Sequence, residues 1–426
     1  MAKGSFAFPQ ATARAQALGE IHARPYALVP SPRVIFQLAF LTEGGSAVDH
    51  AVMAELSRSR GISPPGRDSS HHALSWGQGT LRWERHTEFS TYFWDAPVPE
   101  KFGGEVAVHP FGDSFSPPGT LISGIRLEIR PDSPETREAI ATFDPTSLCY
   151  SEIKNGQGVV LTDFRQNGDG LTQILVIDRG MTEAGRGALV QRLLDIETYR
   201  MAALMGLPAA RETGAWLADG EAELAALAEQ VQGAAKADEA ALLDRLTRLA
   251  AALESRYAAT HTRFSASAAY FSLVEQRLAD IAETRIEGMQ SLHDFMQRRL
   301  LPAMHTCRSA DRRQAALSQR IERTSSLLRT RVEVEQQQSN RELLAGMNRR
   351  QELQLKLQST VEGLSVAAIS YYVLGLLGYL FKGAQSLGWP FSAEASIAVA
   401  VPLVVALVWW SLRQLHHRVM GRGPDA

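Results

Sequence analysis

The stretch LQSTVEGLSVAAISYYVLGLLGYLFKG, Leu357–Gly383, decides the architecture of this 426-residue chain. Its central part, LSVAAISYYVLGLLGYLF at 364–381, contains no charged residue. At about 1.5 Å per residue this run is roughly 27 Å long, enough to cross the hydrocarbon core of a bilayer. Because no proline separates the run from the polar sequence before it, we expect one helix to continue from water into a membrane.

A second apolar run, AEASIAVAVPLVVALVWWSL, follows at 393–412 after a short loop. It contains Pro402, which membrane helices tolerate better than soluble helices do. The two runs and the outer loop 382–392 therefore predict transmembrane helices at 364–381 and 393–412. The alternative is a pair of buried helices in a soluble core, but two adjacent runs of this length are hard to bury there.

Basic residues flank the pair of runs on both sides. They are Arg349, Arg350 and Lys356 before the first run, and Arg413, Arg418 and Arg422 after the second. The intervening KGAQSLGWPFSAE holds one lysine and one glutamate. By the positive-inside rule, both termini and the basic tail 413–426 are expected in the cytosol, with the loop outside.

Helix-forming sequence precedes the first run. In the arm 209–302, apolar residues recur at steps of three and four, as on an amphipathic helix. One stripe is Leu242, Leu246, Leu249 and Leu253, and another is Phe271, Val274, Leu278 and Ile281. Pro302 is expected to end this helix. A stalk helix at 303–363 then continues into the first run.

The stalk is polar on most faces. Its sparse apolar positions include Leu328, Val332, Leu343, Met347 and Leu355. Since most helical stability comes from packing, so long a helix is expected to lie in a bundle or coiled coil, formed with its own neighbour or with copies of itself. A passive spacer is the alternative.

Residues 1–208 read as a cytosolic α+β or α/β domain. Short β-rich runs such as RVIFQLAFL, TLISGIRLEIR, GVVLTDFR and TQILVIDRG alternate with turn signals. QNGDG is expected to join two antiparallel strands. AVDHAVMAELSRSRG predicts a helix that stops at Gly61, and EAGRGALVQRLLDIETYRMAALMGLP predicts another that ends at Gly206 and Pro208.

Composition and motifs argue against several function classes. The balance of 44 basic and 46 acidic residues gives no signal for nucleic-acid binding. The two cysteines, Cys149 and Cys307, lie far apart and predict neither a disulfide framework nor a zinc knuckle. A dinucleotide fingerprint, a Walker loop and a G-x-S-x-G elbow are all missing, so neither an enzyme nor a cofactor is expected.

Two short polar stretches invite a site interpretation. SSHH at Ser69–His72 is expected in a polar loop, where adjacent histidines point in different directions and make a poor metal site. EIHARP at Glu20–Pro25 gathers Glu20, His22 and Arg24, for which a salt-linked loop is the simplest interpretation.

A third polar stretch is QRLLDIETYR at 191–200. On a helix its leucines and isoleucine, Leu193, Leu194 and Ile196, would face a core. Its charged residues would form surface or interdomain ion pairs. These are Arg192, Asp195, Glu197 and Arg200.

Together with MAALMGLP and LQSTVEGLSVAAISYY, the stretches EIHARP and QRLLDIETYR resemble signature stretches of a bacterial family of membrane-anchored proteins of unknown function. The resemblance covers essentially the whole chain. It implies a multi-pass protein of the bacterial inner membrane and assigns no activity.

The order of the parts also resembles that of the CorA-type divalent-cation channels. That resemblance implies a homopentamer in which the first span lines a pore and the long helix transmits movements of the cytosolic domain. The CorA family carries Gly-Met-Asn at the end of the first span, where this chain reads YLFKGAQSLGW. The only GMN here is Gly346–Asn348 in the stalk, so the resemblance does not extend to the residues that select magnesium in that family.

Small and weakly polar residues fall within an arc of roughly 80° on the first span at about 3.6 residues per turn. They are Thr360, Gly363, Ala367, Ser370, Leu374 and Gly378. This strip would line a pore, or form a close helix–helix contact. Glu362 would lie at the cytosolic mouth, where it attracts cations or pairs with Lys356, and Lys382 would lie at the outer mouth. A non-conducting scaffold or sensor that binds a cytosolic partner is the alternative function.

Overall fold

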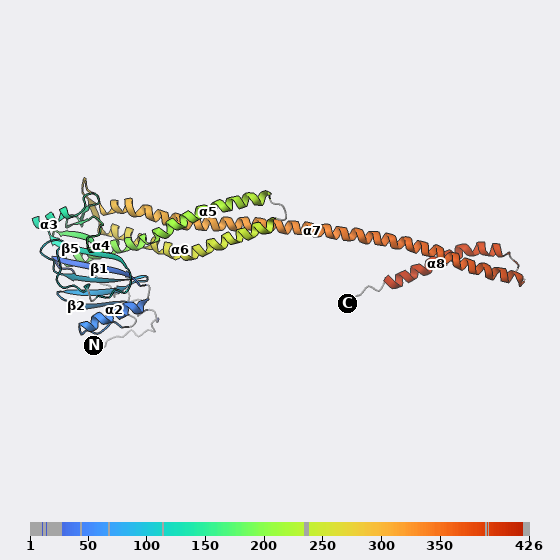
Figure 1. Ribbon diagram of the computed structural model, residues 1–426, viewed down its shortest axis with the longest axis horizontal. Helices are drawn as coiled ribbons and strands as arrows, with labels where there is room; N and C mark the ends of the chain where they lie inside the picture. The colour runs from blue at the N-terminus through green and yellow to red at the C-terminus, as the bar shows by residue number, and fades with distance from the viewer. Residues whose placement is uncertain are drawn as a thin grey trace, which may run out of the picture. The chain divides into compact units, whose positions relative to one another are not determined.

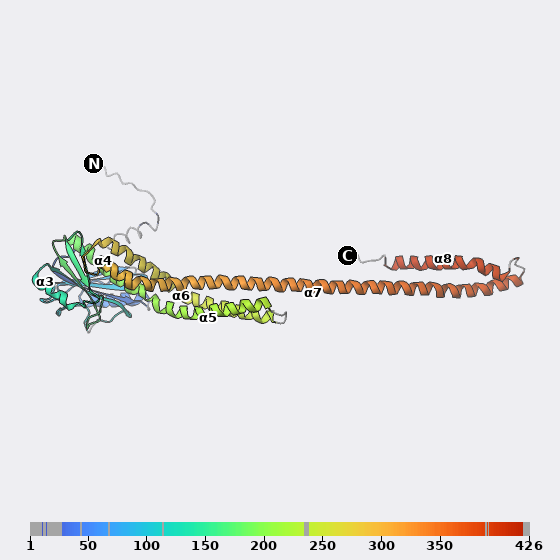
Figure 2. The same ribbon diagram turned by 90° about the horizontal axis from the view of Figure 1, so that it is seen from above.

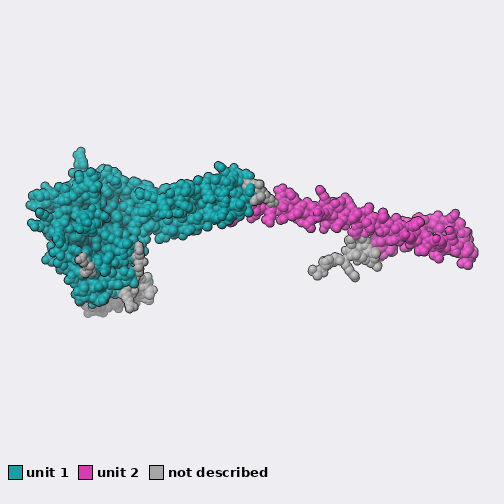
Figure 3. Space-filling view, in the orientation of Figure 1, with its two compact units in different colours: residues 1–325 teal, residues 326–426 magenta. Residues whose placement is uncertain are grey.

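The computed structural model describes residues 28–42, 45–66, 69–112, 115–233, 238–387 and 392–420, together with Ala11, Arg14 and Pro390. The chain divides into two units, Met1–Ser325 and Ser326–Ala426 (Figure 3). The sequence-based boundary at residue 208 therefore falls within the first unit.

In the described part of unit 1, nine strands form one mixed sheet in the order β2-β3-β4-β1-β5-β8-β7-β6-β9 (Figure 1). Their bounds are β1 Arg33–Leu41, β2 His71–Trp76, β3 Gly79–Arg85, β4 Phe89–Ala96, β5 Leu121–Pro131, β6 Cys149–Ile153, β7 Gly158–Thr162, β8 Thr172–Asp178 and β9 Glu283–Arg285. Only the β5–β8 pair is parallel among them. The prediction of RVIFQLAFL as a strand is confirmed, as is the antiparallel β7–β8 pair around QNGDG.

Helices cover both faces of the sheet. Helices α4 (Glu183–Leu204) and α6 (Glu239–Ile281) lie on one face, where Leu127, Leu194 and Val274 share a core. Helix α2 (Ser46–Ser59) covers part of the other face, over a core that includes Trp83 and Trp94. The short helix α3 (Pro134–Glu138) and the 3-10 turn η1 (Ala139–Thr142) cover β7 and β8 on that face.

Unit 1 also contains helix α5 (Gly206–Gly233) and the first part of helix α7 (Leu292–Ser386). Helices α5, α6 and α7 lie side by side in both views (Figures 1 and 2). Arg313 of α7 donates two hydrogen bonds to Glu221 of α5, both 3.0 Å. Both predicted apolar stripes of α6 are buried, which confirms their amphipathic assignment.

The break between the arm and the stalk differs from the expectation. Pro302 lies inside α7 rather than ahead of it. Helix α6 ends instead at Ala282, whose φ of 50° is left-handed, and the chain turns again at Gly288 with φ of 79°. A proline removes one helical hydrogen bond, and the burial of neighbouring Leu300 and Met304 in the core stabilises the helix at this point.

The SSHH stretch is a second difference. His71 and His72 begin strand β2, whose register pairs His72 with Trp83 of β3. Leu74 and Trp76, further along β2, are buried and hold the strand on the core. The apolar contacts of this edge strand therefore override the loop signal of its polar first residues.

Unit 2 consists of α7 beyond Ser326 and helix α8 (Ala393–Met420), which form an antiparallel pair. The backbone N–H of Ala393 donates to Gln385 Oε1 at 3.3 Å. A Cβ added at Gly378 would lie 3.3 Å from Ile397 of α8, so the two helices approach closely there. Within the described residues, α7 and α8 each contain a stretch long and apolar enough to cross a membrane.

Candidate functional site

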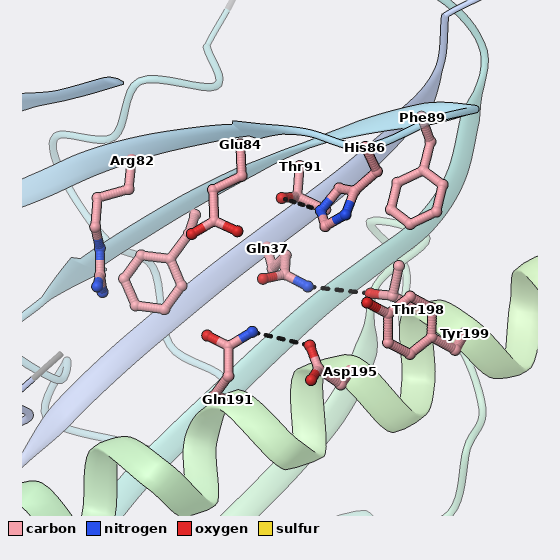
Figure 4. Close-up of a pocket in the computed structure, with 11 residues that line it drawn as sticks. Gln37, Arg82, Glu84, His86, Phe89, Thr91, Gln191, Asp195, Thr198 and Tyr199 are labelled. Carbon is pink, nitrogen blue, oxygen red and sulfur yellow. Dashed lines mark hydrogen bonds between the residues drawn. The ribbon is translucent and has the colours of Figure 1, made fainter. Parts of the chain in front are cut away.

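A small polar cavity lies between the sheet and α4 in unit 1 (Figure 4). Its volume of about 30 Å³ is enough for roughly two water molecules. We call it the α4 pocket. The residues that line it are Gln37, Arg82, Glu84, His86, Phe89, Thr91, Phe93, Gln191, Asp195, Thr198 and Tyr199.

The stretch QRLLDIETYR supplies the helical wall of the α4 pocket. Gln191, Asp195, Thr198 and Tyr199 follow one another at steps of four, three and one, so they share one face of α4. Leu193, Leu194 and Ile196 are buried, as predicted. The stretch therefore has both a core face and a polar face that meets the sheet.

Hydrogen bonds hold this polar face in place. Asp195 accepts from Gln191 Nε2 through Oδ1 and from Arg277 Nε of α6 through Oδ2, both at 2.8 Å. Gln37 of β1 donates from Nε2 to Thr198 Oγ1 at 3.0 Å. These bonds connect α4 to the sheet on one side and to α6 on the other.

The ion pairs of QRLLDIETYR are more deeply buried than expected. Glu197 is 1% exposed, and it accepts two hydrogen bonds from Arg200, of 2.7 and 2.6 Å. Thr172 of β8 donates a third, at 2.9 Å. The prediction of surface or interdomain pairs is wrong for Glu197, which is buried and pairs with Arg200 of the same helix. Asp195 pairs with Arg277, which lies in the arm predicted at 209–302.

Aromatic rings lie next to charged or polar groups at several places around the α4 pocket. The Arg82 guanidinium lies over the ring of Phe93, 3.9 Å from its centroid, and burial lowers the pKa of Arg82. Tyr199 stacks on Tyr270 of α6 at 5.7 Å between ring centroids. Tyr270 donates to Glu88, and burial raises the pKa of this phenol.

Chemically, the α4 pocket is suited to holding waters or a very small polar molecule. Its side chains are bound mainly to one another, and the cavity has little spare volume. This arrangement fixes the angle of α4 on the sheet more directly than it supports a reaction. The sequence analysis did not predict Arg82 and Glu84 as pocket residues. The one signal for them is the alternation of polar and apolar residues in LRWERH, which places both on the same face of β3.

Other reactive side chains do not form a metal or nucleophile site in the described residues. No group of three His, Cys, Asp or Glu there is arranged to hold a metal ion. His72 Nε2 lies 3.2 Å from Ser57 Oγ, in a local contact. Cys149 and Cys307 are both buried, and burial raises the pKa of the Cys149 thiol to about 12, which keeps it in the unreactive thiol form.

The predicted pore strip is divided in the structure of unit 2. Thr360, Gly363 and Ala367 are exposed, whereas Ser370 is 3% exposed and Gly378 is buried against α8. Leu374 and Glu362 are half-buried, and Lys382 is exposed. The EIHARP stretch lies outside the described residues.

The sequence model of a family described as "Protein of unknown function (DUF3422)" matches residues 9–419. The chain belongs to this family. The matched range includes EIHARP, QRLLDIETYR and both apolar runs. The resemblance of these stretches to a family of unknown function is therefore confirmed. No curated protein and no solved structure matches the chain.

Proposed function

We propose that the protein is a homo-oligomer of the bacterial inner membrane, in which α7 couples the α+β region to a pore lined by the first of two spans. The observation that carries this proposal is the continuity of α7, a single helix from Leu292 to Ser386 that joins the sheet core to the first apolar run. A helix without a break transmits displacement along its axis because its turns are hydrogen-bonded to one another.

The layout supports a CorA-like assembly, most simply a pentamer with both termini in the cytosol and the lipid bilayer around the spans. In this arrangement the exposed part of the strip, Thr360, Gly363 and Ala367, faces the axis. Glu362 lies near the cytosolic entrance and Lys382 near the outer one. Nothing in the spans identifies the ion.

The alternative proposal is a non-conducting membrane-anchored scaffold or sensor. It is favoured by the burial of Ser370 and Gly378 against α8 of the same chain, because residues used in that contact are not available to line a pore. In this case the α+β region binds a cytosolic partner, and the spans serve as an anchor.

Ion flux into proteoliposomes separates the two proposals. The Ala367→Trp variant should abolish flux while the oligomer mass in detergent stays unchanged, because a bulky ring at the axis blocks the lumen. The control is Val366→Leu, which lies about 100° further round the helix and should conduct normally. Absence of flux of any tested monovalent or divalent ion through the unmodified protein would favour the scaffold.

A further inference from the structure

The part of α7 that precedes the first apolar run has exposed apolar side chains at coiled-coil spacing. Starting from Leu343, steps of four and three lead through Met347, Arg350, Gln354, Leu357 and Val361 to Leu364. Five of these seven positions are apolar, and these five are between 57% and 76% exposed. Alternating steps of four and three are typical of the contact line between two coiled helices.

Charged residues are almost excluded from this line. Between Leu343 and Leu364 only Arg350 lies on it. At 100° per residue, the other charged residues lie at least about 100° from its centre. They are Arg349, Glu352, Lys356 and Glu362. The residues that flank the line, such as Leu353 and Gln358, are uncharged and exposed. Leu344 and Leu355 are large apolar residues of this stretch that lie about 110° or more from the centre of the line.

Helix α8 leaves this face open. It approaches α7 closely at Gly378, and toward its C-terminal end it lies apart from α7 (Figure 1). The result is an open groove of about 700 Å³ with Leu357 and Val361 on one wall and Leu412 of α8 on the other. The apolar contact line and the open groove leave room for a partner helix that follows the same path.

We propose that residues 343–364 of α7 are a self-association seam, in which the same residues of a second copy pack in parallel and in register. This inference rests on the homo-oligomer of the proposed function, and it turns Leu357, Val361 and Leu364 toward the other copies. At 100° per residue, Thr360 and Gly363 lie about 90° or more from the centre of this line, so the seam does not place them on the axis. A second copy of this chain fits as the partner because its own α7 also continues from a polar stretch into the same apolar run. In a parallel pair, the boundaries between the polar and apolar parts of the two helices therefore lie side by side.

Single-cysteine crosslinking in native membranes tests the seam. The native cysteines are buried, so the unmodified chain provides the background. Leu357→Cys and Leu343→Cys should give at least about fivefold more oxidised dimer than Glu352→Cys and Lys356→Cys, because a disulfide needs Cα atoms about 4.4–6.8 Å apart. All four replacements lie on an exposed helix surface, so none disturbs a core.

The outcomes distinguish this inference from the proposed pore. Crosslinking restricted to Leu357→Cys and Leu343→Cys in a protein that conducts no ion supports the seam and rejects the pore. A stable oligomer that crosslinks equally at all four positions, or at none, overturns the seam while leaving the pore open to the flux assay. A protein that is monomeric in membranes overturns both.

Discussion

Most of the large apolar side chains of the sheet in unit 1 are buried, whereas many of those on α7 in unit 2 are exposed. On β4, Tyr92 and Trp94 are completely buried, whereas Leu343 and Leu364 on α7 are 65% and 76% exposed. The first region obtains its stability from contacts within its own chain. The second has large apolar side chains without such contacts within the described residues, so the stability of this part of the helix does not come from a core of its own.

The largest expected effect concerns the buried charge of unit 1. Glu197→Ala should lower the free energy of unfolding by about 3–5 kcal/mol, because it removes a buried carboxylate and leaves the partly buried Arg200 guanidinium without its partner. Denaturant unfolding of the detergent-solubilised protein measures this loss. The matched control is Asp244→Ala, which breaks an exposed pair with Arg248 and should cost less than about 1 kcal/mol. Equal losses in the two variants would show that burial does not govern these pairs.

Truncation of a leucine compares the two regions directly. Leu127→Ala, in the middle of β5, should lower the unfolding free energy by about 2–5 kcal/mol through lost burial and a residual cavity. Leu343→Ala removes the same atoms from an exposed site and should change the unfolding of unit 1 by less than about 0.5 kcal/mol. Tryptophan fluorescence follows the transition. A comparable loss in both variants would contradict the comparison.

A smaller effect should appear as pH dependence. Asp49 is buried and accepts hydrogen bonds from Ser90 and Tyr92, and burial raises the pKa of its carboxyl group above 3.8. Its protonated form favours the folded state, so this contribution is fully present below pH 3.8 and is lost as the pH rises through the folded-state pKa. Asp49→Asn keeps an acceptor for the hydroxyl groups of Ser90 and Tyr92. This variant should raise the free energy of unfolding at neutral pH by on the order of 1 kcal/mol.

The check on Asp49 is a series of unfolding midpoints against pH. The difference between the Asp49→Asn variant and the unmodified protein should grow with rising pH from the acid side. A difference that stays constant across the series would mean that Asp49 does not titrate in this range.

The smallest effect is expected on the exposed helix. A Cβ at Gly346 meets no atom within 4 Å, so Gly346→Ala should stabilise α7 locally by about 0.5–1 kcal/mol. Amide hydrogen exchange around residue 346 should slow about two- to fivefold. Gly206→Ala is the opposite control, because a Cβ there clashes with the Ser267 hydroxyl and should destabilise the protein.

The strongest local patterns predicted the fold well. RVIFQLAFL is β1, and the leucine stripe from Leu242 to Leu253 is the buried face of α6. Both signals are periodic and depend only on near neighbours. The sequence does not place the edge strand β2 or the helix through Pro302, because each is held by contacts with distant residues, Trp83 for β2 and the sheet core for α7.

The sequence predicted only part of the α4 pocket, because the rest of its wall comes from residues far away along the chain. QRLLDIETYR was singled out and its apolar face was assigned correctly. Its polar partners Gln37 and Arg277 lie 161 and 82 residues along the chain from Thr198 and Asp195, the residues that they contact. No local rule connects them. The burial of Glu197 follows from the enclosure of α4 by the sheet and α6, which the sequence does not reveal.

The position of β9 sets an order of events during synthesis. This strand closes the sheet edge against β6, yet it follows α6, so the sheet is complete only when residue 285 has left the ribosome. About 80 residues separate it from the first apolar run, which at roughly 5–20 residues per second is on the order of 4–16 s of translation. The nascent chain therefore has several seconds in which the sheet can form before the first apolar run emerges.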